Sequence, residues 1–197
     1  MRTAVAFVLL IPLAVSAQTS AADSAFADEV RYRAELDQIV RQLPDVRYPS
    51  GTPRDSMDAN VAGLWRAVDS LNTAWTRGVV TSRGWPKRSE VGTRAAFDFF
   101  LLVQHADLAT QQGMLPLMEA AVAEDEAGGS EFAYLVDRVR VREGRPQVYG
   151  TQLRTVDGLL VPFPIDDEAD VDARRESVGL EPLDAYLDFA RDPDGHH

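Results

Sequence analysis

The stretch RAAFDFFLLVQHADLATQQ, residues 94–112, decides the fold because it is apolar on nearly every face as far as Val103. A helix that is apolar all round belongs at the centre of a domain, where other elements cover every side. Helices that could cover it are predicted wherever apolar residues recur at helical spacing. The four groups are Leu36, Ile39, Val40 and Leu43; Val61, Leu64, Trp65, Val68, Leu71 and Trp75; Met114, Leu117, Met118, Ala121 and Val122; and Phe132, Leu135, Val136 and Val139.

The hydrophobic period changes late in the chain, at residues 147–165. The runs QVYGTQLRTV and LLVPFPI have the character of strands, and Asp157-Gly158 between them is a strong signal for a two-residue hairpin turn. Short helices are expected afterwards, at about 167–178 and 182–190. The predicted fold is therefore mainly α: a compact helical domain of about five to seven helices with one late β-hairpin.

The N-terminus resembles a secretory signal peptide. Residues 1–17 combine an early Arg2, an apolar run and small residues at Val15-Ser16-Ala17. The apolar run is about 13 residues long, shorter than the roughly 20 that a membrane-spanning helix needs. We expect cleavage after residue 17, no membrane span afterwards and a secreted or periplasmic protein; an uncleaved anchor is the alternative. The remaining chain divides into an N-terminal helix and Pro-rich loop (18–57), a single globular helical domain (58–190) and a disordered tail (191–197).

Composition and missing motifs exclude several classes of function. The net charge of −11 argues against nucleic acid as a partner, because two polyanions repel each other. The chain has no cysteine, which excludes thiol catalysis and cysteine-ligated metals. It also lacks a G-x-S-x-G nucleophile motif, a Gly-rich phosphate loop and an H-E-x-x-H zinc motif. We therefore expect no cofactor and no metal site.

His105 is the first candidate for chemistry, because the other two histidines, His196 and His197, lie at a polar terminus. Histidine is the natural general acid or base near neutral pH. Asp107 is its nearest candidate partner, although the two side chains point apart on an uninterrupted helix and Asp107 shares a stripe with Gln104. The alternative is a buried structural histidine that is hydrogen-bonded to a carbonyl or a carboxylate.

The segment AYLVDRVRV, residues 133–141, places Asp137 and Arg138 outside the predicted core face of a helix. Arginine there could pair with a carboxylate or phosphate of a ligand. The same side chains could instead cap the backbone of the neighbouring hairpin.

The segment QVYGTQ, residues 147–152, crowds hydrogen-bonding side chains into a few positions. In an alternating strand Gln147, Tyr149 and Thr151 face one side, and Gln152 faces the other together with Gly150. Amide and phenol groups bind ligands more readily than they react with them, so this strand is expected to recognise rather than to catalyse.

Four strings together resemble a bacterial family known as domain-of-unknown-function family 6624: RGWPKRSEVG, VQHADLATQQ, AYLVDRVRVREGRPQVYGTQ and ARRESVGLEPLDAYL. The resemblance covers roughly residues 58–187, and Q-H-A-D and Y-G-T-Q are its most specific parts. It implies a helical domain of no established activity. It also groups the candidates into one constellation: Gln104, His105, Asp107, Asp137, Arg138, Gln147, Tyr149, Gly150, Thr151 and Gln152.

Three readings of the function remain open on these grounds. The first is an exported protein with a polar ligand-binding site, whose ligand is a polar small molecule or a cell-envelope component. The second is an exported hydrolase or lyase of cell-envelope or extracellular material that uses His105 as its general acid or base. A purely structural or interaction module is the third reading, since the same polar groups could satisfy one another.

Overall fold

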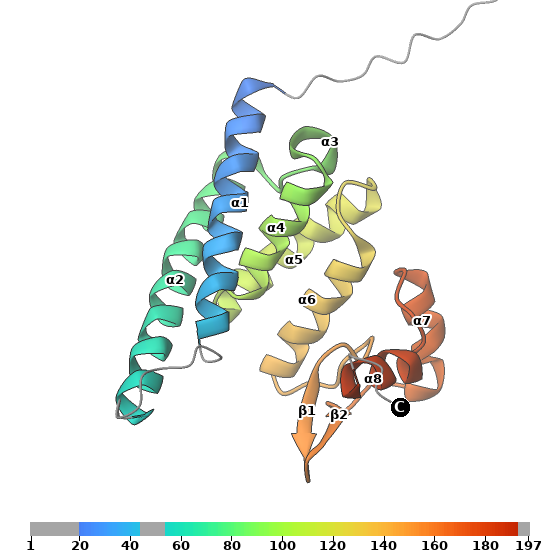
Figure 1. The fold of residues 1–197 in the computed structure, drawn as a ribbon. Helices are drawn as coiled ribbons and strands as arrows, with labels where there is room; N and C mark the ends of the chain where they lie inside the picture. Colours follow the sequence, from blue (N-terminus) through green and yellow to red (C-terminus); the bar gives the residue numbers. More distant parts are fainter. Residues whose placement is uncertain (1–19, 44–53, 193–197) are drawn as a thin grey trace, which may run out of the picture.

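The computed structural model describes residues 20–43 and 54–192 (Figure 1). The predicted signal peptide, most of the Pro-rich loop and residues 193–197 of the predicted tail lie outside these ranges. In chain order the elements are α1 (Ala21–Gln42), α2 (Arg54–Arg83), α3 (Arg88–Val91), α4 (Thr93–Gln104), α5 (Leu108–Ala123), α6 (Gly129–Arg142), β1 (Leu153–Val156), β2 (Leu159–Pro162), the 3-10 helix η2 (Glu168–Asp170), α7 (Val171–Ser177) and α8 (Leu183–Arg191). The predicted mainly α fold with one late hairpin is confirmed.

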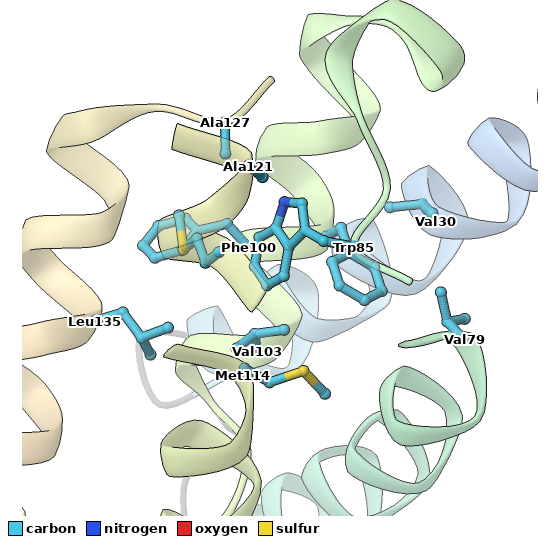
Figure 2. Close-up of a cluster of buried hydrophobic side chains, with 11 residues drawn as sticks. Val30, Val79, Trp85, Phe100, Val103, Met114, Ala121, Ala127 and Leu135 are labelled. Carbon is cyan, nitrogen blue, oxygen red and sulfur yellow. The ribbon is translucent and has the colours of Figure 1, made fainter. Parts of the chain in front are cut away.

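Helix α4 lies at the centre, as its all-round apolar sequence predicts. It contacts α1 and α2 on one side and α5 and α6 on the other (Figure 1). Phe99 and Val103 of α4 are completely buried, and the ring of Trp85 meets Phe99 edge-on at 5.3 Å between centroids. Figure 2 shows how α1, α5 and α6 add Val30, Met114 and Leu135 to the same core.

Helices α1 and α2 extend beyond the groups of apolar residues that predict them. Helix α1 begins earlier than its apolar stripe, because the Ser20 side chain caps it by accepting from the Asp23 N–H (3.1 Å). Helix α2 begins inside the predicted loop and continues through Gly78. A glycine costs a helix about 1 kcal/mol, which packing against α1 and α4 outweighs. Leu64 and Leu71, which the stripe assigns to the core, are exposed.

The helical conformation is interrupted between α4 and α5, at residues 105–107. Asp107 is the N-cap of α5 and its side chain accepts from the Thr110 N–H at 2.7 Å. The segment 94–112 therefore forms two helices with a corner between them, and His105 is the last residue before that corner.

The hairpin is shorter than predicted. Strands β1 and β2 pair antiparallel from Leu153 opposite Pro162 to Val156 opposite Leu159. Asp157 and Gly158 have φ values of 52° and 82°, so the two-residue turn is confirmed. The prediction that 147–152 is a strand is wrong: these residues form a loop. The loop makes an isolated bridge between Gln147 and Ile165, and its last carbonyl, that of Gln152, accepts from the Phe163 N–H.

None of the helices in the described ranges combines the length and the apolar character needed to cross a membrane.

Candidate functional site

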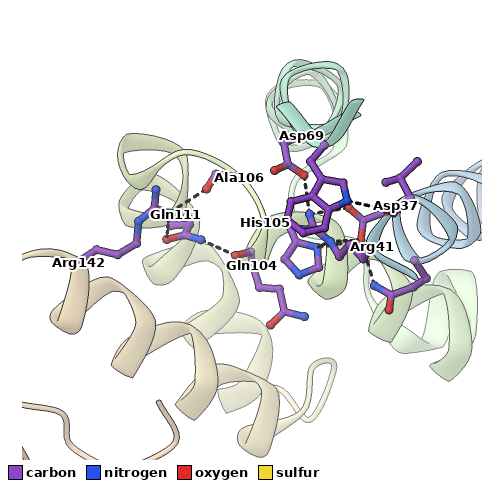
Figure 3. Close-up of polar contacts among 11 residues, drawn as sticks. Asp37, Arg41, Asp69, Gln104, His105, Ala106, Gln111 and Arg142 are labelled. Carbon is purple, nitrogen blue, oxygen red and sulfur yellow. Dashed lines mark hydrogen bonds and ion pairs between the residues drawn. The ribbon is translucent and has the colours of Figure 1, made fainter. Parts of the chain in front are cut away.

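The imidazole of His105 pairs with a carboxylate from the N-terminal helix. His105 Nδ1 lies 2.8 Å from Oδ2 of Asp37 on α1, and the Asp37 side chain is only 1% exposed (Figure 3). The Nε of Arg41, a donor, lies 3.1 Å from both Nδ1 of His105 and Oδ2 of Asp37. With the Arg41 proton given to the carboxylate, the ring proton belongs on Nδ1, which leaves Nε2 as the acceptor. Within the described residues Nε2 makes no hydrogen bond. The contact with Asp37 fixes the orientation of the imidazole ring.

Arg41, one turn beyond Asp37, ties this pair to α2. Its guanidinium donates to Asp37 at 3.0 Å and to Asp69 of α2 at 2.5 Å. Burial alone would raise the pKa of Asp37, but hydrogen bonds from His105 and Arg41 outweigh it and lower the pKa. Burial raises the pKa of Asp69, and the neighbouring Asp37 charge adds to this. Two carboxylates therefore compensate the charge of Arg41.

A cleft of about 320 Å³ opens in front of His105. Helices α1, α2, α4 and α6 and the hairpin all contribute to it. Its polar lining consists of Arg41, Asp69, Gln104, His105, Arg138, Arg142 and Gln152, and its apolar lining of Ala106, Val141, Leu153 and Phe163. Of the residues predicted from the sequence, the structure thus brings Gln104, His105, Arg138 and Gln152 together.

Arg138 contributes to this lining a cation that is not paired with a carboxylate among the described residues. Its Nε is buried without a hydrogen-bond partner, and within the described residues its guanidinium forms no ion pair. Burial lowers the pKa of Arg138, and the charges of Arg142 and Arg41 lower it further. A half-buried guanidinium without a counterion is costly, so this site favours an anion.

Arg142 has a second task at the corner between α4 and α5. Its Nη1 donates to the Ala106 carbonyl at 2.9 Å and to Oε1 of Gln111 at 2.8 Å, and Gln111 donates to the Gln104 carbonyl at 2.7 Å (Figure 3). These bonds fix the corner that presents His105. Arg142 also lines the cleft and has no carboxylate partner among the described residues.

Asp107 does not act on His105. Its carboxylate caps α5, and the hydrogen bonds from Thr110 lower the pKa of Asp107. The helix does break between His105 and Asp107, yet Asp37 occupies the place that the sequence suggested for Asp107. Within the described ranges no group of three acidic or histidine side chains is placed to hold a metal ion.

Asp137 faces away from the cleft and grips the loop 147–152. Its fully buried carboxylate accepts from the backbone N–H groups of Val148 (2.7 Å), Tyr149 (3.1 Å) and Thr151 (2.9 Å), and from the Thr151 hydroxyl (3.0 Å). These are the N–H groups that a strand ladder would need, which explains why the loop is not a strand. These contacts are the ones expected from the alternative reading of the sequence, in which Asp137 caps the backbone near the hairpin.

The carbonyl groups of the same loop are held from the other side. Arg174 donates to the Val148 carbonyl at 2.8 Å, and Arg175, 1% exposed, donates to the Tyr149 carbonyl at 2.7 Å. We call Asp137, Arg174, Arg175 and the loop 147–152 the Asp137 clasp. It is a structural element of the fold.

The remaining polar residues of QVYGTQ divide between clasp and cleft. The buried Gln147 side chain accepts from the Gln152 N–H (2.6 Å) and donates to the Phe163 carbonyl (2.9 Å). Thr151 and Tyr149 bind Asp137, and burial raises the pKa of the Tyr149 phenol. Gln152 alone among them lines the cleft, steadied by a bond from its Nε2 to the Thr151 hydroxyl (3.1 Å).

Asp37, Arg41 and Asp69 were absent from the sequence candidates. Asp37 lies 68 residues from His105 in the chain, so no local motif connects them. One signal existed: Val30, Ala34 and Asp37 follow each other at helical spacing and are all buried, so a carboxylate interrupts the apolar stripe of α1.

The model of a family of unknown function, DUF6624, matches residues 25–197. This range includes α1 and therefore Asp37 and Arg41. Comparison with curated proteins and with solved structures gave no match.

Proposed function

We propose that this chain, which belongs to the DUF6624 family, binds a small anionic ligand in the cleft beside His105. The observation that carries the proposal is the guanidinium of Arg138, which lies in the cleft lining with a buried Nε that has no partner. The planar guanidinium fork matches a carboxylate or a phosphate, and such charge-assisted pairs are the stronger hydrogen bonds.

The charges around the cleft support an anion rather than a cation. Arg41 is compensated by Asp37 and Asp69, whereas Arg138 and Arg142 have no carboxylate partner among the described residues. The chain as a whole carries −11, so the attraction is local to the cleft. A bound anion would also relieve the repulsion between Arg138 and its two arginine neighbours.

Calorimetric titration with inorganic phosphate and with acetate tests the proposal. We expect saturable binding of at least one probe, weakened about tenfold or more in Arg138→Met, because a charge-assisted bond contributes about 1.5–3 kcal/mol. Arg145→Met is the matched control, since Arg145 is exposed and paired with Glu143 outside the cleft. Equal binding by Arg138→Met and wild type would remove the basis of the proposal.

Acid–base catalysis is the second candidate, and the pairing of Asp37 with His105 favours it. The contact orients the ring and leaves Nε2 as an acceptor toward a cleft that could hold a substrate. Hydrolysis of an activated ester such as p-nitrophenyl acetate provides a first assay. We expect turnover to fall in His105→Gln and, less severely, in Asp37→Asn. Replacing His196 and His197 controls for the other imidazoles; turnover that survives His105→Gln contradicts this candidate.

Export remains part of the proposal, on the strength of the charged start, apolar run and Val15-Ser16-Ala17. N-terminal sequencing of the protein recovered from its native host should begin at or near Gln18. An intact Met1 form in the cytoplasm would argue against it.

A further inference from the structure

Three apolar side chains of the cleft lining, Val141, Leu153 and Phe163, form what we call the apolar wall. Val141 lies one helical turn after Arg138, while Leu153 and Phe163 come from the two sides of the hairpin. The hairpin ladder continues beyond its strands, since the Phe163 N–H donates to the Gln152 carbonyl at 3.1 Å. This hydrogen bond holds the Phe163 backbone beside Gln152, which also lines the cleft. An inorganic anion would make no use of the apolar wall.

Two amide side chains, those of Gln104 and Gln152, also belong to the lining. Gln104 contributes to the cleft, and within the described residues its side-chain amide has no hydrogen-bond partner (Figure 3). The Nε2 of Gln152 is engaged with Thr151, so its Oε1 is the atom left to accept. An acceptor beside the arginines suits an N–H group and opposes a fully anionic phosphate.

We infer that the ligand is a carboxylate joined to an amide and an apolar group, as in an N-acylated apolar amino acid. The inference rests on the proposed anion site. Arg138 takes the carboxylate, Gln104 and Gln152 take the amide, and Val141, Leu153 and Phe163 cover the apolar group. The cleft, at about 320 Å³, is at the small end of ligand sites, which span roughly 300–1,000 Å³, and it suits a molecule of this size.

The test compares N-acetylglycine with N-acetylphenylalanine, using calorimetry on the full chain. Burying the benzyl group should make N-acetylphenylalanine bind about tenfold tighter. Phe163→Ala should remove most of this difference and leave N-acetylglycine within about twofold of wild type. Val141→Ala, on α6, repeats the test from the other side if the hairpin variant folds poorly. The unacylated analogue 3-phenylpropionate should bind more weakly than N-acetylphenylalanine, and Gln104→Leu should reduce that preference.

The outcomes separate this inference from the anion site itself. If N-acetylglycine and N-acetylphenylalanine bind equally, or if Phe163→Ala weakens both alike, the apolar wall does not select the ligand and the inference is overturned. If phosphate binds through Arg138 while neither N-acetyl compound does, the anion site stands and the ligand class is wrong. If none of the probes binds, both proposals fall.

Discussion

Asp137 and Arg138 are consecutive residues on α6, and their environments are opposite. The Asp137 carboxylate accepts three backbone N–H groups and a hydroxyl, whereas the Arg138 guanidinium has no hydrogen-bond or ion-pair partner among the described residues. One step along a helix rotates the side chain by about 100°, which turns Asp137 toward the loop 147–152 and Arg138 toward the cleft. A polar group whose hydrogen bonds are all made, like Asp137, holds the fold, whereas one without partners, like Arg138, is open to a ligand.

The strongest test of the comparison is Asp137→Ala. Removing the carboxylate leaves three loop N–H groups without their acceptor in a buried site, so we expect a loss of about 3–5 kcal/mol in the free energy of unfolding. Chemical denaturation measures it. A loss below about 1 kcal/mol would mean that the clasp does not hold the fold.

A smaller effect is expected where the clasp loop turns at Gly150. Its φ is 71°, and a Cβ there would lie 2.8 Å from Cδ1 of Ile165 and 3.0 Å from Cδ1 of Leu183. Gly150→Ala should therefore cost about 2–3 kcal/mol, from backbone strain and overpacking together. Gly158→Ala is the matched control, because φ is 82° but nothing lies within 4 Å, and it should cost about 1 kcal/mol. Equal losses in thermal or chemical melts would count against the close packing at Gly150.

The Asp37 network should give the fold a dependence on acid pH. The pKa of Asp37 is lowered in the folded chain relative to an unfolded value of about 3.9, so its contribution is present above that value and lost as pH falls through the folded pKa. Asp37→Asn should cost about 1–2 kcal/mol at pH 7 and lose less further stability between about pH 5 and pH 2 than wild type. Asp69, whose pKa is raised, acts in the opposite direction, and Asp69→Asn serves as the comparison. Parallel pH profiles for wild type and Asp37→Asn would contradict the pairing.

The smallest expected effect has the opposite sign. Arg138→Met removes an uncompensated, half-buried charge, so stability should stay level or rise by up to about 1 kcal/mol, as is common where a binding group is trimmed. Arg142→Met provides the contrast, because it loses the bonds to Ala106 and Gln111 and should cost about 1 kcal/mol. A clear loss of stability in Arg138→Met would mean that Arg138, like the Asp137 clasp, has a structural role.

The sequence predicts the fold well because its main signals are local. The apolar faces of α4 and the turn residues Asp157-Gly158 each specify their element within a few positions. The loop 147–152 differs from the predicted strand for a tertiary reason: Asp137, from another element, accepts hydrogen bonds from its N–H groups.

The candidate site also contains residues that local signals predict and residues that only tertiary contacts define. His105, Arg138 and Gln152 stand out by residue type and lie in the cleft. The contact between Asp37 and His105 could not be predicted from the sequence, because it exists only after α1 packs against α4. The sequence also could not separate Asp137 from Arg138, since the facing element decides which of two neighbouring polar groups is satisfied.

Because Asp37 and Arg41 come from α1, the site around the cleft forms only when α1 packs against parts of the chain that are distant in sequence. His105 has its carboxylate partner only while α1 is docked, so any opening of α1 would disassemble the site. A ligand that needs the assembled cleft must therefore hold α1 in place by mass action. Amide hydrogen exchange along α1 would slow in proportion to occupancy, so the N-terminal helix would report on ligand binding even though Arg41 is its one residue in the cleft lining.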